Sequence, residues 1–302
     1  MSGWIKALIF LAVLVCAGVV GLLWAFFRHP LAFNAAWERW GLRLQGFHRQ
    51  LVSTSVGPLV AWVRGTGPTV VFLHGAGDQA GTWSRITPSL AKGYRLVLLD
   101  LPGHGGSSPK HGPLPLDVVL AGTRQAVAWV AQGQPVVLVG NSLGAWLACL
   151  LAAEPSLPVR GLVLVNGGPI QGHYLGPTLA PATRQQAREV MRVLMGPAGE
   201  RVPGFVLDDV VRQGRRGPIP RLLAALDSWQ PYVWGREKLS DIGVPVGLVW
   251  GEADQVFDRS YADQLLRSFP NAQVFFLPRC GHVPQRQCPK PFAEALTSAL
   301  NP

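Results

Sequence analysis

A short apolar run that leads into a glycine-flanked serine constrains this 302-residue chain more than any other feature. Residues 135–139 are mostly β-branched, which predicts a buried strand of a parallel sheet. Residues 145–153 have the composition of a helix. Between them stands Gly140-Asn141-Ser142-Leu143-Gly144, whose glycines leave room for a sharp turn with a strained backbone at the serine. Such a turn projects the hydroxyl of Ser142 from the edge of the sheet.

Other apolar runs predict that this strand belongs to a largely parallel sheet. Strands are expected at residues 59–63, 69–73, 95–99, 136–139, 161–165, 246–250 and 273–277. Helix-like stretches such as 116–131 lie between several of them, and this alternation implies a parallel sheet covered by helices on both faces. No strand is expected from residue 167 to about 242. Helical patterns near 181–195, 205–213 and 219–228 predict a helical cap inserted there.

The N-terminal segment has the pattern of a membrane anchor. Residues 7–27 carry no charged side chain and, as a helix, are long enough to cross a bilayer core of about 30 Å. They end in Leu-Leu-Trp-Ala-Phe-Phe instead of a small-residue cleavage site, which favours an uncleaved anchor over a signal peptide. Lys6 precedes the segment and Arg28, Arg39 and Arg43 follow it, so the side of the membrane that holds the rest of the chain stays open.

The next stretch carries apolar side chains at roughly helical spacing with arginines between them. The stripe consists of Trp37, Trp40, Leu44 and Phe47. A basic, tryptophan-bearing stripe suits a membrane interface. The alternative is a linker helix that covers part of the following domain, and the sequence favours neither.

The charge and the cysteines limit which binding partners and cofactors the sequence can be expected to have. The net charge is +10, but the basic residues are scattered and mostly arginine, and no nucleic-acid-binding motif accompanies them. An anionic membrane surface is therefore a better partner than a nucleic acid. The four cysteines fit no metal-ligand spacing, and we expect no metal or other cofactor. Cys280 and Cys288 can pair in an oxidising compartment; whether they do stays open.

Ser142 needs a base, and the base needs a carboxylate. Folds with a serine in such a turn place the acid and then the histidine after it in the chain. His282 follows the last predicted strand, at the edge where ligand sites of open α/β sheets gather. Asp254 follows the strand before it and is preferred to Glu252 and Asp258, for which solvated loop positions are the alternative.

Backbone amides must also stabilise an oxyanion. The amide of Leu143, at the start of the predicted helix, is one candidate donor. The loop His74-Gly75-Ala76-Gly77 after a predicted strand can present another. His74 precedes the serine in the chain and more readily supports the turn than acts as the base. Asn166, at the strand end comparable to that of the acid, carries no charge to stabilise an imidazolium.

Four stretches together resemble the α/β-hydrolase superfamily, in particular its serine esterase and lipase-like members with a helical cap. They are His74-Gly75, residues 100–107, residues 140–144, and the pair formed by Gly251…Asp254 and Gly281-His282. The resemblance covers residue 59 to the C-terminus.

The resemblance implies roles for individual residues. Ser142, Asp254 and His282 would be nucleophile, acid and base, and the amides of Ala76 and Leu143 would form the oxyanion hole. Asp100 and His104 match a turn that is structural in the family. Three side chains are candidates for contact with substrate: His74, Trp83, whose alternative is the core, and His173, whose alternative is a solvated position.

We therefore expect an α/β-hydrolase fold preceded by a single transmembrane helix. Residues 1–28 would be the anchor and 29–54 an amphipathic linker. Residues 55–168 and 236–302 would form the hydrolase core, and 169–235 the cap.

A serine at the turn favours ester hydrolysis over dehalogenation or epoxide opening. The apolar cap and anchor favour an apolar or lipid-like ester as substrate. The alternatives are a carbon–carbon bond hydrolase, an acyltransferase or a perhydrolase with the same triad, or a non-catalytic binding protein of this fold.

Overall fold

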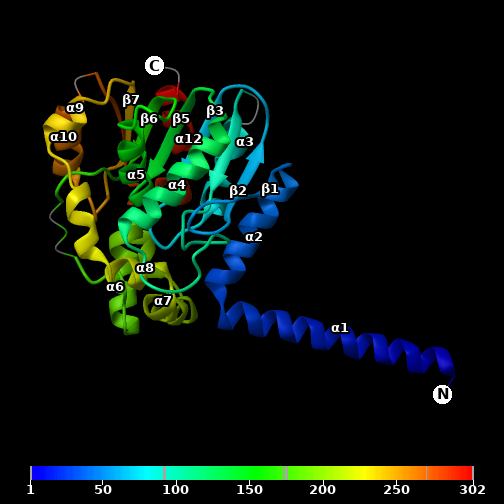
Figure 1. Cartoon of the computed structure of the whole chain (residues 1–302). Helices are drawn as coiled ribbons and strands as arrows, with labels where there is room; N and C mark the ends of the chain where they lie inside the picture. Colours follow the sequence, from blue (N-terminus) through cyan, green and yellow to red (C-terminus); the bar gives the residue numbers. More distant parts are fainter. Residues whose placement is uncertain (1, 91–92, 173, 175, 270, 301–302) are drawn as a thin grey trace.

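A mixed eight-stranded sheet forms the centre of the molecule (Figure 1). The computed structural model describes residues 2–90, 93–172, 174, 176–269 and 271–300. Its strands lie in the order β1-β2-β4-β3-β5-β6-β7-β8; only β2 runs antiparallel to its neighbours. The strands are β1 (His48–Val52), β2 (Leu59–Arg64), β3 (Thr69–Leu73), β4 (Arg95–Leu99), β5 (Val136–Asn141), β6 (Val159–Val165), β7 (Val246–Gly251) and β8 (Gln273–Leu277).

The predicted strands are confirmed, and β1 is an addition. Four of the five β1 residues are exposed and only Val52 is buried, so no apolar pattern marks this strand in the sequence. Its pairing with β2 holds it in place. The predicted linker, residues 29–54, is therefore wrong at its C-terminal end, because the sheet already begins at His48.

Different helices cover the two faces of the sheet. Successive strand residues point to opposite faces. Val71 and Leu73 of β3 join one core cluster, with α4 (Leu116–Ala131), α5 (Leu143–Ala152) and α10 (Arg259–Ser268). Val70 and Phe72 join the other, with η1 (Ala80–Trp83), α3 (Thr87–Leu90) and α12 (Pro289–Leu300).

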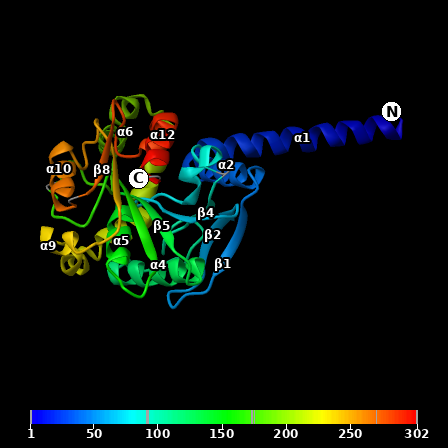
Figure 2. The ribbon, with the colours of Figure 1, turned by 90° about the horizontal axis from the view of Figure 1, so that it is seen from above.

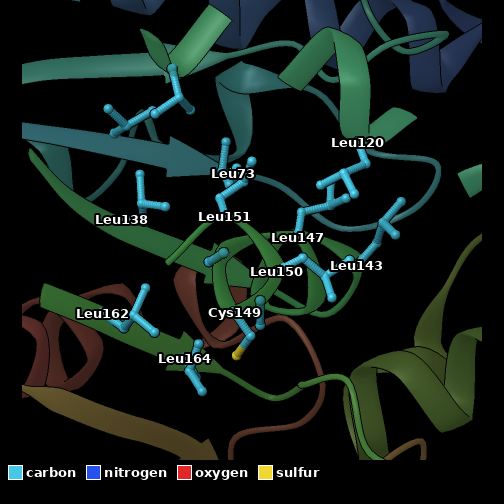
Figure 3. Close-up of a cluster of buried hydrophobic side chains, with 14 of the residues drawn as sticks. Leu73, Leu120, Leu138, Leu143, Leu147, Cys149, Leu150, Leu151, Leu162 and Leu164 are labelled. Atoms are coloured by element: carbon cyan, nitrogen blue, oxygen red, sulfur yellow. The ribbon is translucent and has the colours of Figure 1, made fainter. Parts of the chain in front are cut away.

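Helix α5 is the most deeply embedded of these helices. Figure 3 shows its side chains Leu147, Leu150 and Leu151 beside leucines of three strands. Its first residue, Leu143, is 4% exposed, and the helix therefore has a fixed position against β5 and β6. The serine that precedes it is placed by this packing.

In chain order the cap follows β6 and precedes β7, where the sequence predicts it (Figure 1). Its elements are α6 (Arg184–Met195), η2 (Gly196–Arg201), α7 (Gly204–Arg216), α8 (Pro218–Leu223) and η3 (Leu226–Tyr232), followed by α9 (Arg236–Ser240). The helix expected at 219–228 is divided: α8 ends at Leu223 and a 3₁₀ segment that contains Pro231 follows. Proline has no amide hydrogen to continue an α-helical ladder.

The N-terminal region consists of two helices with different environments. Helix α1 (Gly3–Arg28) has no buried residue and projects away from the domain (Figures 1 and 2). It is the one helix in the described part of the chain with the length and apolarity to span a membrane. Helix α2 (Pro30–Leu44) packs on the domain, where Leu42 is fully buried.

The two sides of α2 have different surroundings, and the inner side confirms the alternative of a linker helix that covers part of the domain. The inner side covers the domain, and Gln45 at the helix end donates to the carbonyl of Ser84 at 3.0 Å. The outer side exposes an apolar stripe, between 39% and 68% exposed, that consists of Phe33, Trp37, Trp40 and Leu44. Phe47, expected in that stripe, instead lies in the core after the helix ends.

Candidate active site

The turn between β5 and α5 holds Ser142 in a strained conformation. Its φ is 53° and its ψ is −116°, in a region that L-residues rarely adopt. The flanking glycines permit this turn because a Cβ at Gly140 would lie 2.2 Å from the carbonyl oxygen of Gly144. A Cβ at Gly144 would lie 2.1 Å from that of Leu73. No larger residue fits at either position, so the predicted elbow geometry is present.

An imidazole and a carboxylate meet after β7 and β8. The Nδ1 of His282 lies 2.9 Å from Oδ2 of Asp254, and both side chains are almost fully buried. A carboxylate accepts, so the proton of a neutral imidazole is on Nδ1 and Nε2 is left as an acceptor. The amides of Val256 and Phe257 donate to Oδ1 of Asp254, at 2.8 and 3.2 Å. The carboxylate is therefore oriented by its own loop as well as by the imidazole.

Asn141, the residue before the serine, ties this pair to the elbow. Its Nδ2 donates to the carbonyl oxygens of Val165 and His282, each at 3.1 Å. Its Oδ1 accepts from Nε2 of Gln285 at 3.1 Å. The backbone of His282 is thus held beside the turn that carries Ser142.

The other acids considered from the sequence have different surroundings. Asp258 caps α10 by accepting from the amide of Tyr261 at 3.1 Å. Glu252 is exposed. Neither meets His282, and Asp254 is the acid that the geometry pairs with it.

Asn166 takes a part that sequence reasoning missed. Its Nδ2 donates to Oδ2 of Asp254, the same oxygen that faces His282. Its Oδ1 accepts from the amide of Gly251 at 3.1 Å. Its place at the sheet edge after β6 is the sequence signal for this role, because a side chain there can donate to an acid as well as serve as one.

Two amides near the serine turn have no protein acceptor among the described residues. The loop after β3 approaches the elbow, since a Cβ at Gly75 would lie 3.3 Å from that of Ser142. Leu143 begins α5, where amides have no intrahelical partner. Among the described residues, neither the amide of Leu143 nor that of Ala76 donates to another protein group. Both stay candidates for the oxyanion hole.

The expectation that His74 contacts substrate is wrong. The side chain is fully buried; its Nδ1 donates to the carbonyl of Gly75 at 2.8 Å and its Nε2 accepts from the amide of Leu101 at 3.0 Å. Neighbouring His104 donates from Nδ1 to the carbonyl of Pro102 at 2.9 Å. Burial lowers the pKa of His74, and it lowers the pKa of His104 to about 3, so both are neutral supports of the turn.

Trp83, the second candidate for substrate contact, belongs to the core. Trp83 is fully buried against Phe72 and Phe292, at ring-centroid distances of 5.2 and 6.2 Å, so the core alternative is correct. Its size and apolarity suit a pocket mouth and a core equally, which is why the sequence did not separate them. His173 lies outside the described residues.

Apolar side chains and the cap surround the reactive groups. Ile219 of α8 packs over the loop after β3, since a Cβ at Gly77 would lie 2.8 Å from its Cδ1. The ring of Phe257 lies 5.8 Å from that of His282. From α6, the carbonyl of Leu194 accepts from the amide of His282 at 3.1 Å. The cap is therefore in direct contact with the loop of the histidine.

A disulfide encloses the histidine turn. Cys280 and Cys288 are bonded, with His282 between them in the chain. The question that the sequence left open is thus answered in favour of pairing. Cys149 is buried in α5 and Cys16 is exposed on α1.

Comparison with curated proteins gives relatives with several activities. A dihydrolipoyllysine-residue acetyltransferase component of the acetoin cleaving system of Cupriavidus necator is 30% identical over 257 residues, which cover 78% of this chain but only 64% of that protein. A 2-hydroxy-6-oxononadienedioate/2-hydroxy-6-oxononatrienedioate hydrolase of Cupriavidus pinatubonensis is 30% identical, covering 77% of this chain and 86% of its own. Human monoacylglycerol lipase ABHD6 is 27% identical, covering 78% and 76%.

Solved structures share the fold. A membrane phospholipase A, described as a bacterial virulence factor, superimposes with a TM-score of 0.77 at 22% identity over 98% of both chains. Residues 70–295 match the alpha/beta hydrolase family. Because this segment is well over half of the sequence and includes Ser142, Asp254 and His282, the chain belongs to the alpha/beta hydrolase family.

Proposed function

We propose that this hydrolase cleaves carboxylic esters through an acyl-enzyme at Ser142. The observation that carries the proposal is the 2.9 Å contact between Nδ1 of His282 and Oδ2 of Asp254, held beside the strained serine by Asn141. This arrangement supplies a nucleophile, a base in the required tautomer and a carboxylate to stabilise the imidazolium. A non-catalytic binding protein would need none of the three.

The chemistry divides into two halves. The Nε2 of His282 removes the proton from Ser142 Oγ, which attacks the ester carbonyl. The amides of Ala76 and Leu143 stabilise the oxyanion of the tetrahedral intermediate. The imidazolium returns the proton to the departing alkoxide, and the acyl group remains on Ser142. Water, activated by the same imidazole, then attacks the acyl-enzyme and releases the acid.

We propose an apolar, lipid-like ester as the substrate. Ile219 and Phe257 line the reactive region with hydrocarbon, which suits an acyl chain better than a charged group. The names of two similar proteins, a monoacylglycerol lipase and a membrane phospholipase A, agree with this substrate class.

We further propose that α1 is a single-pass anchor and that the stripe on α2 lies in the membrane interface. Helix α1 is apolar and has no buried residue, and α2 presents two tryptophans outward. The cap joins this region: Phe205 of α7 contacts Phe26 and Phe27 at centroid distances of 5.6 and 5.1 Å. Asp209, buried in α7, accepts from the amide of Leu31 at 2.9 Å. The cap then faces the lipid from which an ester would enter.

The disulfide favours one side of the membrane. Structural disulfides persist in oxidising compartments and are rare in the cytosol. The Cys280–Cys288 bond therefore supports placing the catalytic domain on the non-cytosolic side, with the N-terminus in the cytosol. A reporter fused after Pro302 tests this orientation.

Labelling with a fluorophosphonate probe tests the catalytic proposal. The full-length protein in detergent should label and should hydrolyse nitrophenyl esters, and Ser142→Ala should do neither. Labelling of Ser142→Ala at the wild-type rate, or an unlabelled wild-type protein, would overturn the assignment.

A second reaction, carbon–carbon bond hydrolysis, has support from the 30% identical dienedioate hydrolase. The same triad serves both. Parallel assays with nitrophenyl esters and a dienoate ketone separate them: turnover of the esters alone favours the ester hydrolase, and faster turnover of the ketone favours the alternative.

A further inference from the structure

Three consecutive side chains shortly after His282 connect its turn to the serine turn, the cap, the loop after β3 and helix α2. They belong to the short helix α11 (Pro284–Gln287). Gln285 is fully buried and donates to Asn141 beside the serine. Gln287 accepts from the amide of Gly281 at 2.7 Å and donates to the carbonyl of Leu194 in the cap at 3.2 Å. Arg286, between them, has the most distant partners.

Arg286 links the loop after β3 to the N-terminal helix. Its Nη2 lies 2.6 Å from Oδ1 of Asp78, and its Nε donates to Oδ2 of the same carboxylate at 3.3 Å. Its Nη1 and Nη2 also donate to the carboxylate of Glu38 in α2. Asp78 lies two residues after Ala76, and its amide donates to the carbonyl of Gly75 at 3.2 Å. One guanidinium thus fixes the distance between the oxyanion loop and the histidine turn.

Glu38 is well placed for this contact and unusual in the sequence. It is the only acidic residue among the first 77 residues. Its side chain is 10% exposed, and its Oε2 accepts from Nε2 of Gln79 at 2.7 Å. Helix α2 approaches η1 so closely that a Cβ at Gly81 would lie 2.8 Å from that of Glu38. The carboxylate therefore faces the site and not the solvent.

Charge balance holds the cluster together. Burial alone would raise the pKa of Asp78, but attraction to Arg286 and their hydrogen bonds outweigh burial and lower it. The carboxylate of Asp78 thus stays ionised beside the guanidinium. Removing one charge from such a group leaves the others buried without compensation. The two carboxylates without Arg286 would repel each other and move the loops that they belong to.

We propose that Glu38, Asp78 and Arg286 form a positioning cluster for catalysis, through which the helix next to the membrane becomes part of the active site. The cluster holds the amide of Ala76 at a fixed distance from the turn of His282. None of the three residues reacts with substrate. The inference rests on the proposed ester hydrolysis, in which both the amide and the imidazole act on one carbonyl group.

Steady-state kinetics on the full-length protein in detergent, with a short soluble nitrophenyl ester, test this cluster. Arg286→Gln should lower kcat by about 100-fold, the cost of misplacing reacting groups by about 1 Å, while KM changes less than about threefold. Glu38→Gln should lower kcat by about tenfold. Arg286→Lys keeps the charge but not the planar fork, so its kcat should lie between those of Arg286→Gln and wild type.

The double variant Glu38→Gln/Arg286→Gln is the decisive comparison. Because the two residues act as a unit, its loss of kcat should be clearly smaller than the product of the two single losses. Asp263→Asn is the matched control, since it breaks the exposed Arg259–Asp263 pair on α10 and should leave kcat unchanged.

The outcomes separate the cluster from the proposed function. If the wild type neither labels with fluorophosphonate nor hydrolyses esters, the ester hydrolase itself is wrong. If the wild type is active and Glu38→Gln and Arg286→Gln keep its kcat, or lose activity only in proportion to unfolded protein seen by circular dichroism, the positioning cluster is wrong.

Discussion

Two turns that carry a histidine lie at the same edge of the sheet, and the two histidines have different hydrogen-bond partners. In the turn after β3, both ring nitrogens of His74 are bonded to backbone groups. In the turn after β8, the Nδ1 of His282 meets a carboxylate, and its Nε2 has no hydrogen bond within the described structure. Each histidine lies near a buried aspartate that follows another strand: Asp100 after β4 for His74, and Asp254 after β7 for His282.

The partners of the aspartates explain the difference. Asp100 accepts from the amides of Ala80 and Gly106, at 2.7 and 2.8 Å, and so closes a turn. Asp254 accepts from an imidazole as well as from amides. A histidine–aspartate pair therefore indicates catalysis only where one ring nitrogen is left for a substrate or nucleophile. This distinction generates four predictions.

The largest expected effect is on the catalytic turn. Asp254→Asn should lower kcat by about 10⁴-fold, because the amide favours the wrong tautomer of His282. Loss of the base in His282→Ala should cost at least as much. Hydrolysis of a nitrophenyl ester at saturating substrate measures both.

His104→Asn, in the loop after β4 where the ring of His104 lies 5.2 Å from that of His74, is the control. It can retain the donor to the carbonyl of Pro102 and should keep kcat within about threefold of wild type in the folded fraction. If His104→Asn lowered kcat as much as Asp254→Asn or His282→Ala, the proposed difference between the histidines would be wrong.

His104 should instead affect how the free energy of unfolding depends on pH. The folded-state pKa of His104 is about 3, below its unfolded value near 6.5, so the unfolded state binds more protons in this interval. Stability present above pH 6.5 is therefore lost as the pH falls toward 3. From pH 6.5 to 4.5 the free energy of unfolding should fall by about 2.3 kcal/mol from this group, because the unfolded histidine is half protonated at the start of the interval.

Urea denaturation at several pH values measures this slope. His104→Asn should flatten it, whatever its stability at neutral pH. An unchanged slope in that variant would mean that His104 is not the group that titrates on unfolding.

The catalytic turn has a covalent constraint that the structural turn lacks. The Cys280–Cys288 bond closes a short loop, and loop-closure entropy assigns it about 2–3 kcal/mol of stability. Reduction, or Cys288→Ser, should lower the free energy of unfolding by that amount and lower kcat through a looser His282.

Cys16→Ser, a change on the exposed face of α1, is the control and should respond to reductant as the wild type does. A reduced protein with full stability and full kcat would show that burial alone fixes the catalytic turn as it fixes the other.

The sequence predicted some features of the fold and site better than others, because some depend on neighbouring residues and others on residues far apart in the chain. β3, β4 and β8 have the predicted bounds because their apolar runs are continuous. Order along the chain, together with position after a predicted strand, selected Asp254 and His282, which the structure pairs. The roles of Asn166 and Arg286 depend on contacts 88 to 248 residues away, which no local pattern records. β1 was missed because its exposed residues take their conformation from β2.

The smallest expected effect concerns Asn166, which follows β6 and donates to Asp254, the proposed acid. Its φ of 47° favours glycine or asparagine, so Asn166→Gly removes the donor without adding backbone strain. Asp254 keeps its two loop amides and the imidazole, and kcat should therefore fall only about tenfold.

Asn166→Asp makes the sharper test. It retains the shape but places a second carboxylate against Asp254, and like charges at that distance raise the pKa of one of them. The acid limb of the kcat–pH profile should move to higher pH in Asn166→Asp and stay in place in Asn166→Gly. If both variants shift the limb equally, Asn166 acts on the fold of the turn and not on the charge of Asp254.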